Sequence, residues 1–425
     1  MHKILSLLGF FLISIIIVFL LIFVMIDSNL FNLKQKLYST YPNIEVRKKI
    51  FNKKSIMNNL KNDYNVKFLP STQFENLNYK KKKIVFDNNL VSKSTNFDQS
   101  ISYKRYNSFF IDYYDKNIFI TDRSGNLFFF DQEKLFSNKK EIFAKSIENN
   151  LISSRVFDSF IFDGKIFVSF TSNQNGCNTI NINFAELNYK KLIFKKFFNP
   201  KECNKTGSPG RIQLYEYQNM KGLLLSTAEG EKDKPGINTQ NKNSIYGKIL
   251  FIPLNGDKSS IFSLGHRVIQ GLNVNENNII ATEHGPRGGD EINLILNQKN
   301  YGWPIVSLGE KYNLSQENKI LSYKKNHKAN NFEEPIFSFI PSVGISEIIK
   351  LPNTFSVYYD NHYLLSSLNG GSIFLIRFSN NLKKILTLEK VFIDNRIRDL
   401  KYLKDFNSII LALEENGEIG ILSKK

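Results

Sequence analysis

Side chains able to do chemistry gather in four short clusters of this sequence, each directly before a run of β-forming residues. The clusters are Gly207–Arg211, Gly265–Gln270, Pro341–Ser346 and Arg396–Asp399. They contain arginines, a histidine, a glutamine and an aspartate. If the fold brings the clusters together, they form a concave polar site of the kind that binds small ligands.

Repeated short β-rich runs must position these clusters. Pairs of such runs, separated by polar turn residues, recur roughly 45 to 85 residues apart, as in the blades of a propeller. Each pair follows another predicted strand, and these begin near Phe109, Val156, Arg211, Gln270, Ile345 and Ile397. A β-sandwich would not need six similar modules in tandem. The sequence therefore predicts an all-β, six-bladed β-propeller over residues 101–425, with the clusters at one mouth of its central channel.

Three ordered blocks carry a family resemblance. GHRVIQGL at Gly265–Leu272 is followed by TEHGPRGGDEIN at Thr282–Asn293 and NYGWP at Asn300–Pro304. Together they resemble the soluble aldose sugar dehydrogenases that depend on pyrroloquinoline quinone (PQQ), the glucose/sorbosone dehydrogenase family. Weaker similarity lies at Thr121–Gly125, Gly247–Leu250 and Arg396–Asp399. The resemblance covers about residues 100–425 and implies the same six-bladed propeller.

The resemblance implies PQQ as the cofactor, a flat ortho-quinone with three carboxylates. Arginine suits such a ligand because its planar fork pairs with carboxylates through two hydrogen bonds. Arg267, Arg396 and Arg398 stand at the family's cofactor positions, and Gln270 is assigned to the same site. The alternative for each arginine is a structural role, in which it binds carbonyls at the blade ends.

The resemblance also implies a Ca²⁺ ion that polarises the quinone. Calcium takes oxygen ligands, and the carbonyls of Gly285 and Pro286 match the family's ligand positions. Asp290 and Glu291 either add charge there or cap the turn. Trp303 is expected to pack beneath an inserted loop rather than to stack on a substrate.

The match fails where the family places its catalytic histidine, which takes the proton from the anomeric hydroxyl of the sugar. The aligned stretch here begins with Gly207, so no catalytic residue is identified. General-base catalysis contributes about 10²–10⁴-fold, so its loss should cripple hydride transfer without abolishing cofactor binding. Glu202 or Asp290 would be the nearest replacement bases. A second departure is Val268, where the family usually has asparagine.

Two functions remain open at this point. The first is a membrane-anchored, PQQ-dependent sugar dehydrogenase that oxidises a sugar with Ca²⁺ assistance and passes electrons to an acceptor. The alternative is a non-catalytic, degenerate propeller that binds a glycan or an anionic ligand at the channel mouth. The net charge of 57 − 39 = +18 does not indicate nucleic acid as a partner, because no recognition motif accompanies the lysines.

The amino terminus predicts a membrane anchor. Residues 4–26 carry no charge and are long enough, as a helix, to span the hydrocarbon core. No small-residue cleavage site follows, which favours an uncleaved anchor over a signal peptide. We therefore expect a single-pass anchor over residues 1–27 in the inner membrane and a periplasmic globular domain. Residues 28–100 are predicted to be a basic stalk, either touching anionic lipid or leading as a solvated linker into a first strand at Ile84–Phe86.

The two cysteines, Cys177 and Cys203, have no zinc-site spacing. In an exported domain a disulfide between them can persist.

Overall fold

The structure is a computed structural model that describes residues 67–68, 77–87, 108–153, 155–174, 176–204, 210–230, 236, 238–311 and 323–424. The chain divides into two compact units, Met1–Asn58 and Asn59–Lys425, and every described residue belongs to the second. The predicted anchor, most of the predicted stalk and Gly207 lie outside the described residues. Among those that are described, no helix has the length and apolar character needed to cross a membrane.

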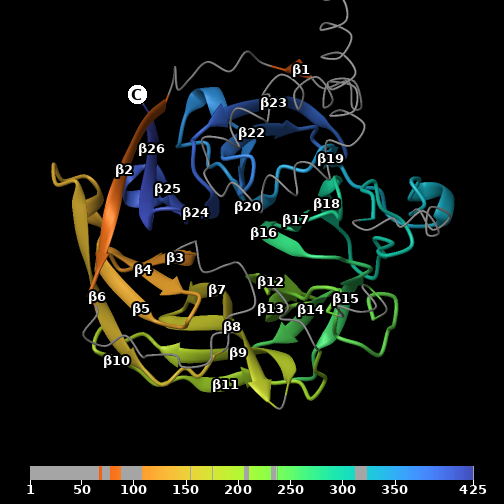
Figure 1. The fold of residues 1–425 in the computed structure, drawn as a ribbon, viewed down its shortest axis with the longest axis horizontal. Helices are drawn as coiled ribbons and strands as arrows, with labels where there is room; N and C mark the ends of the chain where they lie inside the picture. The colour runs from red at the N-terminus through yellow and green to blue at the C-terminus, as the bar shows by residue number, and fades with distance from the viewer. Residues whose placement is uncertain are drawn as a thin grey trace, which may run out of the picture. The chain divides into compact units, whose positions relative to one another are not determined.

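The second unit is built almost entirely from antiparallel sheets (Figure 1). Three of them have four strands each. One contains β7 (Arg155–Phe162), β8 (Lys165–Gln174), β9 (Cys177–Glu186) and β11 (Lys195–Phe198). The next contains β12 (Ile212–Tyr217), β13 (Met220–Ser226), β14 (Lys248–Pro253) and β15 (Ser260–Leu264). The third contains β16 (Ile269–Asn275), β17 (Asn278–Glu283), β18 (Asp290–Ile295) and β19 (Phe337–Phe339).

Two larger sheets complete the described strands. The five-stranded sheet holds β20 (Ile345–Lys350), β21 (His362–Ser367), β22 (Ser372–Phe378), β23 (Ile385–Phe392) and β1 (Lys67–Phe68). The nine-stranded sheet has two groups of strands joined by β2 (Leu77–Phe86). The first group is β3 (Phe109–Tyr114), β4 (Asn117–Asp122), β5 (Leu127–Asp131) and β6 (Glu141–Asn149), with β10 (Lys191–Leu192) beside β6. The second group is β26 (Glu418–Lys424), β25 (Ser408–Leu413) and β24 (Ile397–Leu403). Short 3₁₀ helices are η3 (Gln132–Leu135), η5 (Lys328–Asn330), η6 (Val357–Tyr359) and η7 (Lys404–Phe406).

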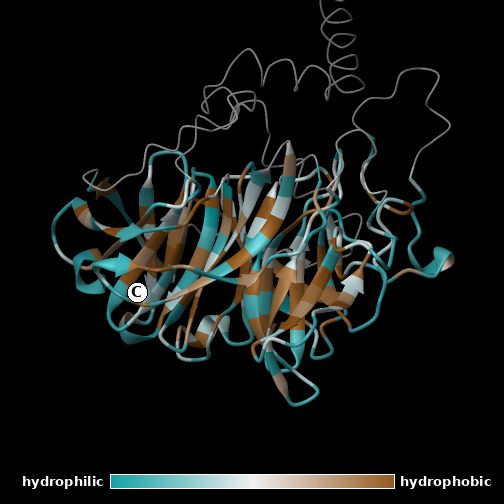
Figure 2. Cartoon of the chain, turned by 90° about the horizontal axis from the view of Figure 1, so that it is seen from below, coloured by the Kyte–Doolittle hydropathy of each residue, from teal (hydrophilic) through white to brown (hydrophobic). Residues whose placement is uncertain are grey.

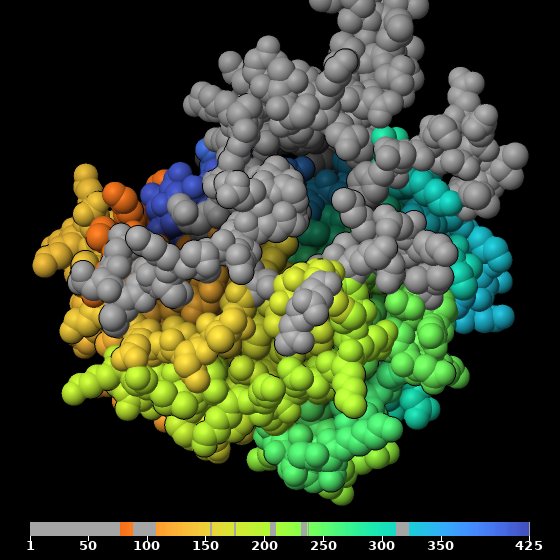
Figure 3. Space-filling model, turned by 60° about the horizontal axis from the view of Figure 1, so that its bottom comes forward, coloured from red at the N-terminus to blue at the C-terminus, as the bar shows by residue number. Residues whose placement is uncertain are grey.

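The strands β3, β7, β12, β16, β20 and β24 lie around the centre of this unit, and their sheets extend outward (Figure 1). Each begins within one residue of the start predicted from the sequence. In the space-filling view, segments coloured from orange through yellow to green follow one another around the rim (Figure 3). The fold is all-β and propeller-like, as the sequence predicts.

Apolar side chains fill the space between neighbouring sheets, and the strands carry brown bands while most loops are teal (Figure 2). One cluster contains Ile180 and Ile182 of β9 together with Leu223 and Leu225 of β13, and all four are fully buried. Burying an isoleucine side chain contributes about 1.5–3 kcal/mol. These contacts fix adjacent sheets to one another and so fix the inner strand ends.

Strand β2 confirms a strand at Ile84–Phe86, but the strand is longer than predicted and includes the lysine run of the expected stalk. It pairs antiparallel with β26 and parallel with β6. Lys81 and Lys83 form ion pairs with Glu418 and Glu141. Lys82 is 6% exposed, and its ammonium donates to the carbonyls of Lys134 and Ser137. These lysines are therefore part of a sheet rather than of a linker.

Buried carboxylates join each inner strand to an adjacent inner strand. Each accepts a backbone N–H from another inner strand, at 2.8 to 3.2 Å. The pairs are Asp399 with Ile111, Asp112 with Ile161, Asp158 with Ile212, and Glu347 with Leu272. A buried carboxylate is stabilised by such charge-assisted hydrogen bonds, which are stronger than neutral ones. They hold the strands that carry the site.

Candidate functional site

A cavity of about 390 Å³ lies where the inner strands begin. Six arginines line it: Arg123, Arg155, Arg211, Arg267, Arg396 and Arg398. The rings of Phe110 and Phe157 supply apolar wall, and Glu229 is the one carboxylate among the lining residues. A pocket with this lining suits a flat, multiply anionic ligand, because arginine forks bind carboxylates and aromatic rings accept a planar ring system.

The predicted cofactor residues Arg267, Gln270, Arg396 and Arg398 all line this cavity. The structure therefore brings together side chains that are as much as 131 residues apart in the chain. Gln270 accepts a hydrogen bond from Arg398 Nη1 at 3.0 Å, which links the start of β16 to the start of β24.

Arg396 and Arg398 share one buried carboxylate, Glu414. Arg396 Nε lies 3.0 Å from its Oε1, and Arg398 Nε lies 2.8 Å from its Oε2. Ser108 donates a further hydrogen bond at 2.6 Å. Burial alone would raise the pKa of Glu414, yet Arg398 and then Arg396 hold that pKa well below its usual range. Glu414 therefore stays ionised and holds both arginines at the cavity wall. Arg396 and Arg398 thus have a structural partner and also line the cavity.

Arg211 also lines the cavity and is 3% exposed. Its Nη1 lies 3.1 Å from Asp158, 3.1 Å from Glu347 and 3.2 Å from Asp399. These carboxylates come from three different sheets. One guanidinium thus connects three inner strands at the cavity wall.

The acids around Arg211 are crowded in a dry environment. Burial raises the pKa of Asp158 to about 6 and that of Glu347 to about 7, although Arg211 opposes both shifts. Mutual repulsion with Asp399 adds to the rise. Asp158 and Glu347 therefore release their protons at a higher pH than ordinary carboxylates do.

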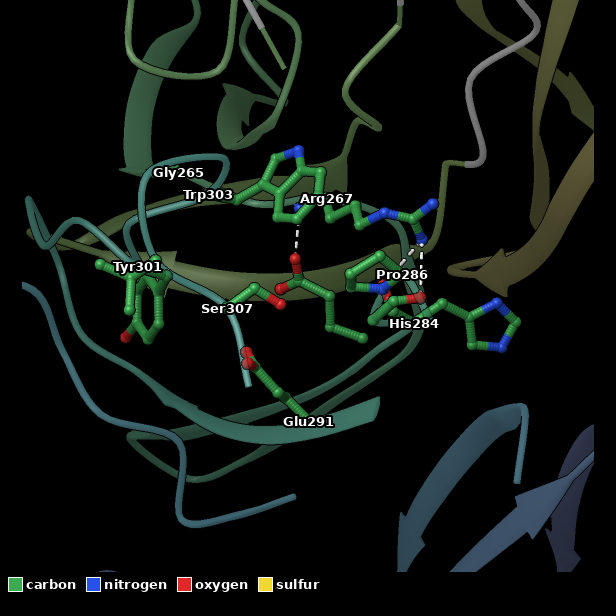
Figure 4. A pocket seen from close by; sticks show the side chains of 11 residues that line it. Gly265, Arg267, His284, Pro286, Glu291, Tyr301, Trp303 and Ser307 are labelled. Carbon is green, nitrogen blue, oxygen red and sulfur yellow. Dashed lines mark hydrogen bonds between the residues drawn. The ribbon is translucent and has the colours of Figure 1, made fainter. Parts of the chain in front are cut away.

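Arg267 lies between this cavity and a smaller one of about 10 Å³ (Figure 4). Its Nη1 donates to the carbonyls of His284 and Gly285, both at 3.0 Å. Its Nε lies 3.5 Å from Glu229, and its guanidinium lies over the Trp303 ring at 5.3 Å. The structural alternative, an arginine bound to carbonyls, therefore describes Arg267 even though it also lines the larger cavity.

Trp303 is 4% exposed and donates from Nε1 to Glu229 at 2.8 Å. Its ring lies 5.0 Å from that of Tyr323 on its inserted loop. Because Trp303 is almost fully buried, it packs inside the protein rather than stacking on a substrate, as the sequence predicts.

The predicted calcium ligands have other hydrogen-bond partners in the structure. The Gly285 carbonyl is already an acceptor for Arg267. Asp290 turns its oxygens to backbone N–H groups, of Gly285 at 3.1 Å and of Val343 and Gly344 at 3.1 and 2.7 Å. Of the two roles expected for Asp290, adding charge at the metal site or capping the turn, the structure shows the cap. Within the described ranges, no group of three His, Cys, Asp or Glu side chains is placed to hold a metal ion.

Glu283 and Glu291 line the small cavity in Figure 4. Asn293 donates toward both carboxylates, at 3.5 and 3.4 Å. Burial, with repulsion from Glu283, raises the pKa of Glu291 to about 8. Glu283 also accepts from His266 at 3.1 Å, and His266 is fully buried. Glu283 is therefore hydrogen-bonded to both His266 and Asn293.

Gly207, at the position expected for the base, lies outside the described residues. Of the four described histidines, His284 alone lines the large cavity, and its Nε2 donates to the Ile345 carbonyl at 2.6 Å. Glu202 accepts from Ser244 and from the Ile245 N–H, at 2.5 and 2.8 Å, which is a structural role. Asp290 is occupied as a cap.

Cys177 and Cys203 form the expected disulfide, with their Cα atoms 5.6 Å apart. Backbone hydrogen bonds between Asn178 and Asn204, at 2.7 and 2.9 Å, extend the link. The bridge ties the start of β9 to the segment that follows β11.

Sequence reasoning missed four contributors to the site: Arg123, Arg155, Glu229 and Glu414. Arg123 lies in the turn at Thr121–Gly125, which is part of the family resemblance, so that turn could have indicated it. Arg155 opens β7, where the other clusters predict a site residue. Glu229 and Glu414 have no local motif, and their partners come from distant parts of the chain.

Residues 108–422 match the model of the glucose/sorbosone dehydrogenase family. The aldose sugar dehydrogenase YliI of Escherichia coli is 29% identical over 173 residues, which cover 40% of this chain and 45% of that protein. Quinoprotein glucose dehydrogenase B of Acinetobacter calcoaceticus is 34% identical over 113 residues, covering 24% and 23%. The chain spans about half the length, or less, of the curated relatives it matches.

Solved structures share the fold. The soluble aldose sugar dehydrogenase of Escherichia coli in its apo form superposes with a TM-score of 0.57 at 19% identity, covering 76% of this chain and 96% of that one. The PQQ-bound aldose sugar dehydrogenase of Streptomyces coelicolor gives a TM-score of 0.55 at 16% identity, covering 76% and 94%. Because the family model matches residues 108–422, which are most of this chain, the chain belongs to the glucose/sorbosone dehydrogenase family.

Proposed function

We propose that this protein binds PQQ in the arginine-lined cavity and acts as a sugar dehydrogenase of the aldose type. The observation that carries the proposal is the convergence of six arginines and two phenyl rings on one cavity of about 390 Å³. PQQ is flat and carries three carboxylates, so it needs both kinds of wall. Among relatives, the Streptomyces enzyme is named as PQQ-bound.

Arg396, Arg398 and Gln270 would hold the carboxylates, because Glu414 presents both guanidinium groups at the wall. Arg267 would face the cofactor from the other side of the cavity. When bound, PQQ supplies an ortho-quinone that accepts hydride from the sugar. The chain's part is to orient the cofactor and to neutralise its charge, which is the preorganised electrostatics on which such sites depend.

We also propose that the fold is a six-bladed propeller. The nine-stranded sheet then contains two blades, which meet where β2 pairs in parallel with β6. Counted this way, β3, β7, β12, β16, β20 and β24 are the innermost strands of six blades. Carboxylate bonds between inner strands support this count, since each links one blade to the next.

We also propose that residues 1–27 anchor the protein in the inner membrane and that the globular unit is periplasmic. The uncharged apolar run at residues 4–26 supports the anchor. The disulfide supports an oxidising compartment, where such bonds persist. An electron acceptor and an aldose are the expected partners.

A second function keeps one specific observation in its favour. Gly207 stands where the family has its catalytic histidine, and glycine offers no proton acceptor. A non-catalytic propeller that binds a glycan or an anionic ligand at the same cavity would retain the arginines and lack the base.

Dye reduction separates the two functions. The full-length chain, loaded with PQQ, is assayed with an artificial electron acceptor across a panel of aldoses. Turnover with at least one aldose supports the dehydrogenase. Saturable PQQ binding with no turnover on any sugar supports the non-catalytic alternative.

A further inference from the structure

We propose that the guanidinium of Arg267 takes the place of calcium in this chain, so that cofactor binding needs no metal ion. The inference rests on the proposed function for its ligand, and on the geometry around Gly285 for its argument. The family resemblance assigns the Gly285 carbonyl to Ca²⁺, whereas the structure gives that carbonyl to a cationic side chain.

The contact is a double one. Arg267 Nη1 lies 3.0 Å from the carbonyl oxygen of His284 and 3.0 Å from that of Gly285. A terminal guanidinium nitrogen carries two N–H groups, so it can satisfy both carbonyls at once. A Ca²⁺ ion bound to the same Gly285 oxygen would lie beside a positive charge, and the two cations would repel each other.

Arg267 is held in place from several directions. Its backbone N–H donates to the Glu283 carboxylate, and its backbone carbonyl accepts from Glu229 at 2.8 Å. Its Nε faces Glu229 at 3.5 Å, and the Trp303 ring supports its guanidinium. The side chain is only 16% exposed. Moving it away to admit a metal would break all of these side-chain contacts together.

The nearby acidic side chains do not complete a calcium site. Calcium takes 6–8 oxygen ligands, usually with carboxylates among them. Asp290, the nearest acid in sequence, is occupied by backbone N–H groups of its own loop and of residues 343–345. In the part of the chain that the structure describes, no cluster of three acidic, histidine or cysteine side chains could hold a metal.

The guanidinium of Arg267 can also polarise a quinone oxygen, which is the role that the family resemblance assigns to calcium. In Figure 4 its second terminal nitrogen points away from the two carbonyls, and Arg267 lines the large cavity. From there Nη2 can donate a hydrogen bond to an oxygen of the bound quinone. A fixed cationic donor stabilises negative charge on such an oxygen, as a Lewis acid does.

The test begins with the metal-free, full-length chain and needs no cofactor. CaCl₂ is titrated calorimetrically into the wild type, Arg267→Ala and Arg267→Gln, each checked for native circular dichroism. We expect at least one calcium site in the variants that is absent, or at least 10-fold weaker, in the wild type. Equal calcium binding by all three proteins would overturn the inference whatever the fate of the proposed function.

The second arm adds PQQ, with EDTA or with CaCl₂. We expect the wild-type affinity to be the same within about 2-fold in both buffers, and Arg267→Ala to bind at least 10-fold more weakly in EDTA, with recovery in calcium. A wild type that loses PQQ in EDTA and regains it in calcium refutes metal independence. A wild type that binds no PQQ in either buffer refutes the proposed function instead, and the first arm still decides the inference. Arg377→Ala, exposed on β22, is the control.

Discussion

Arg211 places one guanidinium nitrogen 3.2 Å from a carboxylate oxygen of Asp399, although 188 residues separate the two in the chain. The same nitrogen reaches Asp158 and Glu347 from two other sheets. This single buried cation therefore connects widely separated parts of the propeller at its axis.

Replacing Arg211 should destabilise the whole unit. Arg211→Met leaves three buried carboxylates without their common cation, and breaking a buried pair in this way costs about 3–5 kcal/mol. Urea denaturation followed by circular dichroism measures the loss. Arg377→Ala, an exposed position in β22, should change the free energy of unfolding by no more than about 0.5 kcal/mol. An Arg211 variant as stable as this control would show that the acids do not depend on it.

Glu347 predicts a pH dependence of stability. Its folded pKa of about 7 lies above the ordinary value of 4.5, so the folded state binds its proton more tightly than the unfolded state. The corresponding stability is fully present below about pH 4.5 and is lost as pH rises through about 7. Glu347→Gln should flatten this decline by roughly 1–3 kcal/mol between pH 5 and 8.

The measurement is a series of denaturation curves from pH 5 to 8. Glu186→Gln, at a largely exposed carboxylate, should leave the slope of the wild type unchanged. If Glu347→Gln keeps the wild-type slope as well, another group is responsible for the decline.

Lys248 should be one of the costliest lysines to replace. It is fully buried, and its ammonium donates to the carbonyls of Asn238, Thr239 and Tyr246 at 2.9, 2.9 and 2.6 Å. Lys248→Met would leave these carbonyls without their donor, at a cost of about 3 kcal/mol. Lys221→Met, exposed in the same sheet, is the matched control. Thermal unfolding of both variants would settle the matter, and equal melting temperatures would contradict it.

The disulfide should contribute measurable stability. It closes a sequence separation of 26 residues, for which the loss of chain entropy in the unfolded state corresponds to about 3 kcal/mol. The double variant Cys177→Ala, Cys203→Ala should lose about that much. Adding a reductant should bring the wild type down to the level of the variant. Mass spectrometry that finds two free thiols in the purified, unreduced protein would remove the disulfide from the account.

The sequence was informative wherever a residue's role depends on its neighbours in the chain. Inner strands were predicted because β-forming runs and turns alternate locally, and the cofactor residues because their blocks are contiguous. Arg267, Gln270, Arg396 and Arg398 do meet at one cavity.

The sequence was silent where a role depends on a distant partner. Nothing near Glu414 indicates that two arginines 16 and 18 residues earlier will turn to it. Lys82 reads as part of a solvated basic run, because only the folded chain brings the carbonyls of Lys134 and Ser137 to its ammonium. The carbonyl of Gly285 likewise reads as a metal ligand until Arg267 is seen on it.

The most direct test of the account is a calorimetric titration of the full-length protein with PQQ. We predict saturable binding of one PQQ per chain, weakened at least 10-fold in Arg398→Ala and in Arg396→Ala and unchanged in Arg377→Ala, all with native circular dichroism. No binding by the wild type, or equal affinity in the wild type and both cavity variants, would contradict the assignment of the arginine-lined cavity to the quinone.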